Sequence, residues 1–109
     1  MANTFKLKTK ANVGVTTVGI YTAPAATTTV VIGITLSNTS GSGVNVGVGI
    51  TRAGTTEDVK LLKNAPIPQG SSLEFMGGNK VVLETTDTLT VDSDTNKSVD
   101  AALTIIEIT

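Results

Sequence analysis

Oxygen-bearing side chains recur at every second position between residues 92 and 100, and no other part of the sequence has a spacing so close to that of a metal site. The run consists of Asp92, Asp94, Asn96, Ser98 and Asp100. A calcium-binding loop places carboxylate, amide and hydroxyl oxygens in this way. The match then fails, because Lys97 stands where such a loop needs glycine and Leu103 where it needs a bidentate glutamate. We therefore expect an acidic loop between two strands, keep calcium as a hypothesis, and assign no metal site.

The residue types on which most catalytic sites depend are missing. The sequence contains no histidine and no cysteine, which removes Ser-His-Asp arrangements, thiol nucleophiles, the common zinc sites and disulfides. Carboxylate neighbours such as Glu57 and Asp58 could act as an acid and a base on a sugar, but the chain has only three aromatic residues to form a sugar platform. We therefore predict no enzyme, no catalytic residues and no cofactor.

Basic residues alternate along the N-terminal segment. In an extended chain, alternate side chains share one side, so the lysines at positions 6, 8 and 10 are expected to point together. The candidate partner-binding arm comprises Thr4, Phe5, Lys6, Leu7, Lys8 and Lys10. An acidic protein is the expected partner, and a solvated edge strand is the alternative. No nucleic-acid partner is expected, because the isoelectric point is about 5.2 and stacking aromatics are scarce.

Charge is distributed unevenly along the chain. Residues 1–56 carry three lysines and one arginine without any acidic residue, whereas residues 57–109 carry all nine acidic residues and four lysines. The two halves are therefore expected to attract one another. No signal-peptide core is visible, and no apolar stretch approaches the length of about 18 residues that would span a bilayer. We expect neither secretion nor a membrane partner.

Apolar and small or polar residues alternate with a period of two in residues 28–37 and again in 44–50. In the first segment Val30, Ile32, Ile34 and Leu36 are expected to share the inward face. The turn-forming residues 38–43 separate the two segments, so the pair is predicted to form a hairpin.

The final strand, expected over residues 99–108, is apolar on both faces. Leu103 and Ile105 lie on one face, and Ile106 and Ile108 on the other. A strand of this kind is either central in a sandwich or covered by a neighbouring subunit. We therefore predict a subunit-contact strand formed by Leu103, Ile105, Ile106 and Ile108.

Short strands at intervals of about ten residues, separated by Gly, Pro, Asn and Asp, predict an all-β fold. The expected architecture is a single antiparallel β-sandwich, jelly-roll or Ig-like, of about eight short strands with an extended N-terminal arm. Residues 1–12 are assigned to that arm or to an edge strand, and residues 13–109 to the sandwich domain.

Several stretches, taken in order, carry a family resemblance. They are residues 1–6, 21–25, the threonine run before 30–34, 62–71, 77–84 and 105–109. In order and spacing they resemble small virion structural proteins of tailed bacteriophages, particularly phages of aquatic bacteria such as cyanobacteria. Proteins of this family serve as capsid decoration or cement subunits, or as accessory parts of the neck, tail or baseplate.

The resemblance implies a place on the virion, with the capsid surface favoured over the tail, for a protein made in the host cytoplasm. The implied partners are other copies of the chain, in a trimer, and the major capsid protein or another virion protein. A neck, tail or baseplate subunit is one alternative. A carbohydrate-binding module for host attachment is another, although the chain has no tryptophan and one tyrosine on which a sugar could stack.

Overall fold

The computed structural model describes residues 3–52, 57–75 and 80–109, and these residues form nine strands and no helix. The strands are β1 (Asn3–Val13), β2 (Val18–Thr22), β3 (Thr28–Asn38), β4 (Val44–Arg52), β5 (Glu57–Ile67), β6 (Ser72–Phe75), β7 (Val81–Leu83), β8 (Thr88–Ser93) and β9 (Val99–Ile108). Threonine, valine and isoleucine dominate them, and these residues favour the pleated backbone. The predicted all-β fold is confirmed.

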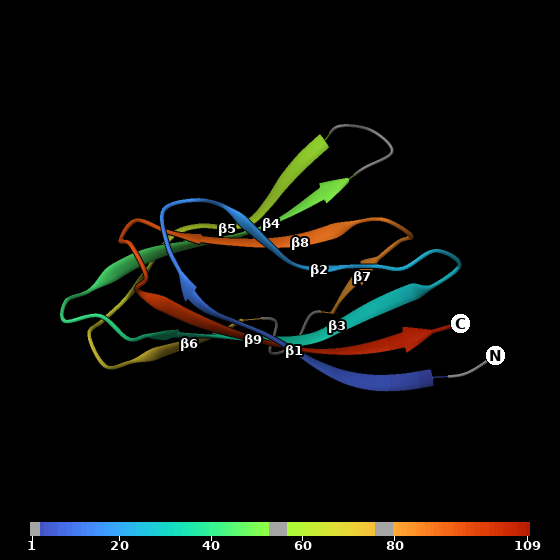
Figure 1. Cartoon of the computed structure of the whole chain (residues 1–109), viewed down its shortest axis with the longest axis horizontal. Coiled ribbons are helices and arrows are strands. Elements are labelled where there is room, and N and C mark those ends of the chain that lie inside the picture. Colours follow the sequence, from blue (N-terminus) through green and yellow to red (C-terminus); the bar gives the residue numbers. More distant parts are fainter. Residues whose placement is uncertain (1–2, 53–56, 76–79) are drawn as a thin grey trace.

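The strands form two antiparallel sheets packed face to face (Figure 1). Sheet A has the order β1-β9-β3-β6, with β7 also paired to β3, and sheet B has the order β2-β8-β4-β5. β7 and β6 pair with successive parts of β3, so together they fill one strand position. With that position counted once, the order is that of a jelly roll, which resolves the alternative between a jelly roll and an Ig-like sandwich.

The predicted hairpin between residues 28–37 and 44–50 is wrong. β3 pairs with β9, β6 and β7 in sheet A, whereas β4 pairs with β5 and β8 in sheet B. Asn38, at the end of β3, explains how the chain leaves the sheet. Its side-chain amide donates to the backbone carbonyls of Ser42, Ile67 and Pro68, so the polar groups of the crossing loop find partners.

The predicted inward face of residues 28–37 is correct only in its second half. The pairing of β3 with β9 shifts between Val31 and Gly33, which marks a β-bulge. A bulge reverses the alternation, so Val31 is buried ahead of it and Ile34 and Leu36 are buried after it. Val30 lies on the outer side instead.

The core lies between the sheets and is built from aliphatic side chains. Its largest fully buried members include Ile34, Leu36, Ile67, Leu83, Leu89, Leu103 and Ile105. Every sheet therefore has one inner face against this core and one outer face. The outer faces and the edges are where the candidate contact surfaces lie.

Candidate interaction surface

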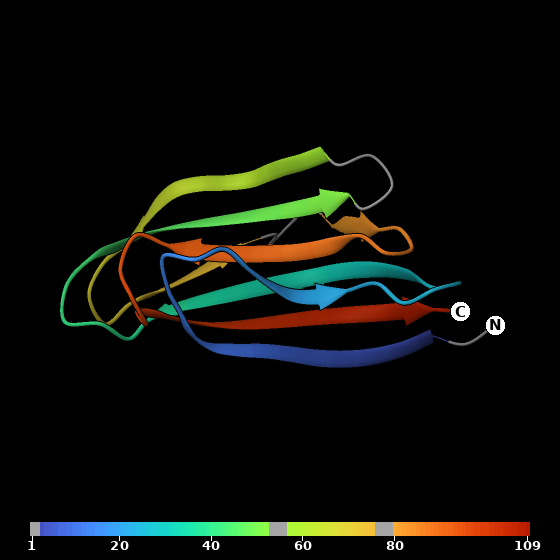
Figure 2. The same cartoon turned by 45° about the horizontal axis from the view of Figure 1, so that its top comes forward.

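Residues of the predicted N-terminal arm form the edge strand of sheet A. From Asn3 to Lys10 each residue of β1 has a partner in β9 (Figure 2). The sequence left open whether this segment is a reaching arm or an edge strand. In the structure its described residues form an edge strand. The register shifts between Lys10 and Val13, so the regular ladder with β9 ends at Lys10.

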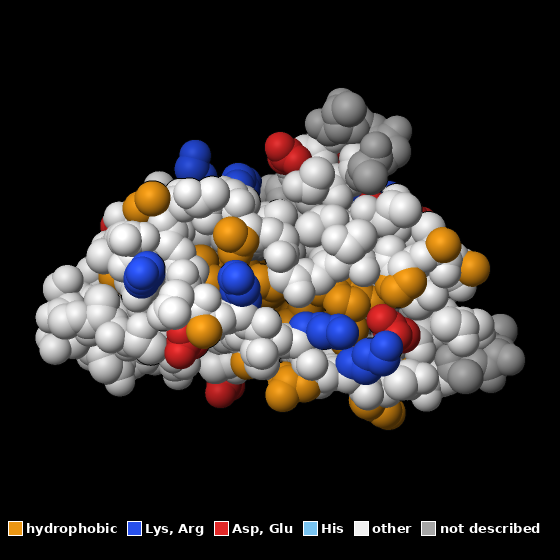
Figure 3. All heavy atoms as spheres, viewed as in Figure 1, with side chains coloured by type: hydrophobic (Ala, Val, Ile, Leu, Met, Phe, Trp, Pro, Cys, Tyr) orange, Lys and Arg blue, Asp and Glu red, His pale blue; other side chains and the backbone are white. Residues whose placement is uncertain are grey.

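The two sides of β1 carry opposite chemistry. Thr4, Lys6, Lys8 and Lys10 alternate with Phe5 and Leu7, so the lysines share the side that faces β2 of sheet B. Basic side chains run along this side of the molecule, over the gap between the two layers (Figure 3). Phe5 and Leu7 point to the outer face of sheet A. The proposed arm is therefore a strand with one basic side and one apolar side.

A buried polar network joins the two sheets behind the lysines. Lys6 Nζ lies 2.8 Å from Glu107 Oε1, and the Tyr21 hydroxyl donates to Glu107 Oε2 at 2.6 Å. Because the Tyr21 proton is used in this way, Tyr21 accepts from the Thr29 hydroxyl, whose oxygen is 2.8 Å away. Tyr21 belongs to sheet B and the other three residues to sheet A, so the network locks the layers together at this edge.

The network shifts two pKa values. The hydrogen bond from Lys6, followed by that from Tyr21, holds the pKa of Glu107 below its ordinary value of 4.5. Burial, with the hydrogen bond to Glu107, raises the pKa of Tyr21 from 10.0 to about 12. Glu107 is therefore kept ionised and Tyr21 neutral near neutral pH.

The expected attraction between the two halves of the sequence is realised by ion pairs. Lys6 contacts Glu107, and Arg52 contacts both Glu84 and Asp87. Asp87 is buried, and its contact with Arg52 raises the pKa of the guanidinium. These pairs fasten β1 to β9 and the end of β4 to the turn before β8.

The outer face of sheet A has an apolar half. Phe5 lies opposite Ile106 across the β1–β9 pair. Ile106 lies opposite Val30, and Val30 lies opposite Val82. Phe5, Leu7 and Val82 are 71%, 65% and 54% exposed. We define the apolar half as Phe5, Leu7, Val30, Ile32, Val82, Ile106 and Ile108.

The predicted subunit-contact strand coincides with β9, and two of its four named side chains face outward. Leu103 and Ile105 are fully buried in the protein's own core, so they cannot contact another subunit. Alternation along β9 forces this, because Ala101, Leu103 and Ile105 all face sheet B. Ile106 and Ile108 are half-buried on the outer face and stay available for contact.

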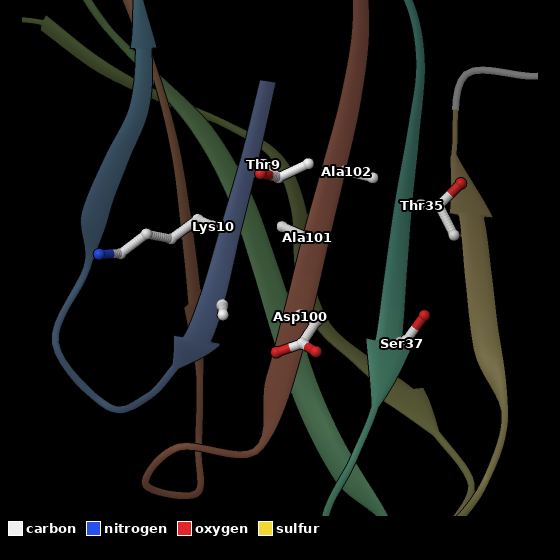
Figure 4. A pocket seen from close by; sticks show the side chains of 8 residues that line it. Thr9, Lys10, Thr35, Ser37, Asp100, Ala101 and Ala102 are labelled. Carbon is white, nitrogen blue, oxygen red and sulfur yellow. The ribbon is translucent and has the colours of Figure 1, made fainter. Parts of the chain in front are cut away.

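The other half of the same face is hollowed, and its lining consists mainly of small side chains together with Lys10 and Asp100. The hollow has a volume of about 270 Å³ and lies across β1, β9 and β3, with Thr9, Ala102 and Thr35 in neighbouring positions. Figure 4 shows these side chains on three adjacent strands, with the Lys10 ammonium directed away from them. We define the small-residue half as Thr9, Ala11, Thr35, Ser37 and Ala102.

The acidic run does not converge on one point. Asp92 accepts a hydrogen bond from the Thr17 hydroxyl on the outer side of sheet B. Asp94 accepts one from the backbone N–H of Asn45, and Asp100 accepts one from the backbone N–H of Asn12 beside sheet A. The run joins β8 to β9, which belong to different sheets, so its side chains diverge. Within the described ranges no group of three or more such ligands could hold a metal ion.

The outer face of sheet B is polar and close-packed. Gly47 and Gly49 of β4 lie on it, and a Cβ at Gly47 would come within 2.7 Å of the Asp92 carboxylate. The absent side chains leave room for Asp92 and Thr90 to lie against the β4 backbone. Thr22 and Thr88 are hydrogen-bonded to each other on the same face. Several polar groups of this face therefore have partners within the chain.

The sequence alone does not predict the apolar half as a continuous surface. It assigns Phe5 and Leu7 to a basic arm and Ile106 and Ile108 to a contact strand, two features far apart in the chain. The available signal was the period of two in both terminal strands, but their pairing in register is a tertiary fact. Val82 carried no distinguishing signal.

Comparisons with known proteins indicate a fold and no family. The sequence matches no protein-family model and no curated protein. One solved structure that resembles it comes from a study of Bacillus endospore appendages that form disulfide-linked pili. The identity is 17%, the match covers 99% of this chain and 87% of that one, and the TM-score is 0.57. At this identity the likeness concerns the fold. Among the described residues no helix is suited to crossing a membrane.

Proposed function

We propose that this chain is a structural subunit that works by contact with other protein subunits and carries out no chemistry. The observation that carries the proposal is the apolar half of sheet A, where Phe5, Leu7 and Val82 are more than half exposed on one face. Contiguous exposed apolar surface on a small domain usually marks a protein-contact site. The jelly-roll likeness to a pilus protein also supports a structural role.

Within that class we propose a virion structural protein of a tailed bacteriophage, with decoration of the capsid surface as the favoured role. The support is the sequence resemblance described above. In this role the apolar half is covered by another subunit, while Lys8 and Lys10 on the edge of sheet A are available to an acidic neighbour. Shell reinforcement follows by mass action, because a partner that binds only the intact shell stabilises it.

Binding to particles tests this role. Purified protein is added to virions that lack it, and bound protein is located by electron cryomicroscopy and counted by quantitative electrophoresis. The proposal predicts density on the shell in numbers that scale with its area. Density at the neck or tail in few copies would replace shell decoration by an accessory role, and no binding to particles would overturn the virion proposal.

A filament subunit is the second candidate, because one solved structure with a similar fold comes from a study of pili. The disulfide linking described for those pili is unavailable to a sequence without cysteine, so filaments of this chain would be held by surface contacts alone. Negative-stain microscopy of the concentrated protein distinguishes the candidates. Open filaments support the second candidate, whereas discrete particles of fixed size support the first.

A further inference from the structure

We propose that the outer face of sheet A packs against the same face of a second copy, related by a twofold axis that crosses the strands at Leu7. This inference rests on the proposed function in one respect only, which is that the apolar half is a contact surface. It adds the identity of the partner and the geometry of the contact.

The arrangement of large and small side chains carries the inference. Large apolar side chains occupy one end of the face, including Phe5, Ile106 and Val82. Small side chains occupy the other end, where Thr9, Ala102 and Thr35 border the hollow of about 270 Å³. The face therefore has a raised apolar end and a hollow end with small residues. When a second copy is laid on it with its strands reversed, the raised end of each copy meets the hollow end of the other. Two faces that interdigitate in this way reach the packing density of a sandwich core.

The register fixes where the axis must lie. Counting along β1 and β9, the row of Leu7, Thr104 and Gly33 lies between the row that contains Phe5 and the row that contains Thr9. An axis across the strands at this middle row places Phe5 of one copy over Thr9 of the other. It also places Leu7 over Leu7. The same axis places Thr104 over Thr104 and Gly33 over Gly33, so the leucine pair is the one large contact of the middle row.

The available area is sufficient for a stable pair. β9 has ten residues and sheet A is four strand positions wide. With strands about 4.8 Å apart and a rise of about 3.3 Å per residue, the face measures on the order of 600 Å². A pair would then bury on the order of 1,200 Å², which is at the lower limit of specific protein interfaces.

The charges on the face agree with this arrangement. Among the described strand residues of the outer face, the charged side chains are Asp100 and Glu74, and both lie at the small-residue end. Reversal of the second copy moves its carboxylates to the opposite end of the interface, so like charges are kept apart. The axis places Asp100 over Ile108 and Glu74 over Val82 of the other copy. Both carboxylates are exposed and lie at the end or the edge of the face, where they would form part of a polar rim. A closed pair of this kind is isologous and differs from the trimer that the family resemblance implies.

Charge substitutions at Leu7 test the axis. We expect Leu7→Lys and Leu7→Glu each to raise the dissociation constant of the pair by about a hundredfold, because like charges would face each other at the axis. An equimolar mixture of the two variants is expected to restore pairing, since Lys and Glu then face one another. Sedimentation equilibrium gives the association constants, and circular dichroism with urea unfolding checks that each variant is folded. Asn45→Lys, on the exposed outer face of sheet B, is the matched control and should pair like the unmodified protein.

The outcomes test the twofold contact and the virion role separately. Restored pairing in the mixture, with the single variants monomeric, supports the twofold contact whether or not the protein binds particles. A monomeric unmodified protein, a trimer, or a mixture that stays dissociated overturns the second-copy inference. If an unmodified monomer still binds virions and Leu7→Lys abolishes that binding, the face contacts a different virion protein and the proposed function stands. If the pair forms but no particle is bound, the virion role fails alone.

Discussion

The outer faces of the two sheets differ although both sheets back onto the same core. The outer face of sheet A exposes Phe5, Leu7 and Val82, while that of sheet B consists largely of threonine, glycine and charged side chains that bond to one another. Several polar side chains of sheet B find partners within the chain. Sheet A has apolar surface that water covers poorly, and a second protein surface would remove it from water. Sheet A is therefore the layer that is expected to make the contact.

The largest expected effect separates the inner from the outer side of β9. Leu103→Ala should lower the free energy of unfolding by about 2–5 kcal/mol, because the side chain is fully buried and a cavity is left behind. Ile106→Ala, on the half-buried outer side, should cost clearly less when the protein is monomeric. Urea unfolding at low protein concentration measures both, and equal losses would remove the distinction between the two sides.

Acid should weaken the edge where β1 meets β9. The pKa of Glu107 is lowered in the folded state, so its contribution to stability is present above the ordinary value of 4.5 and is lost as the pH falls through the lowered folded value. Glu107→Gln should flatten this part of the pH profile of the urea midpoint. Lys6→Met, which removes the first cause of the shift, should flatten it partially. An unchanged acid profile in both variants would show that the network does not stabilise the fold.

Alkali tests the same network from its other side. Tyr21 is the sole tyrosine and the chain has no tryptophan, so tyrosinate absorbance reports on this residue alone. Its pKa is raised to about 12, so the associated stability is present below 10.0 and is lost as the pH rises toward 12. The absorbance midpoint should lie near 12 in the folded protein and fall in Glu107→Gln. A midpoint near 10.0 in folded protein would contradict the buried position of Tyr21.

The smallest expected effect is on the outer face of sheet B. Lys60 Nζ lies 3.9 Å from Asp92 Oδ2, and both side chains are substantially exposed. Lys60→Met should change the free energy of unfolding by less than about 1 kcal/mol, because exposed ion pairs contribute little. Association should be unaffected as well. A large change in the free energy of unfolding would mean that this ion pair is not a weak surface contact, and a large change in association would mean that sheet B carries the contact.

The sequence was sufficient for the fold class and for the sides of a regular strand. Alternation placed Leu103 and Ile105 opposite Ile106 and Ile108, and the structure agrees. The sequence did not predict the inward face where the alternation is interrupted, nor the strand pairing where the partners are far apart in the chain. The bulge between Val31 and Gly33 reverses the inward face of β3, and β3 and β4 enter different sheets although turn residues join them.

The candidate surface was predictable only in pieces, for the same reason. Phe5 and Ile106 are about as far apart in the sequence as two residues of this chain can be, yet they are direct neighbours across β1 and β9. The alternating lysines led to the prediction of a basic partner-binding arm in the N-terminal segment. The lysines face the gap between the sheets, and Lys6 is paired within the chain.

Thiol labelling shows which outer face a partner covers, and so tests whether sheet A makes the contact. The unmodified sequence has no cysteine, so a single introduced thiol reports its own position. Leu7→Cys and Asn45→Cys place one thiol on the exposed outer face of sheet A and one on that of sheet B. Maleimide labelling rates are compared between dilute, dissociated protein and the assembled state, in concentrated solution or on particles. The account predicts that assembly protects the Leu7→Cys thiol and leaves the Asn45→Cys thiol reactive. Protection of Asn45→Cys with free labelling of Leu7→Cys would contradict it.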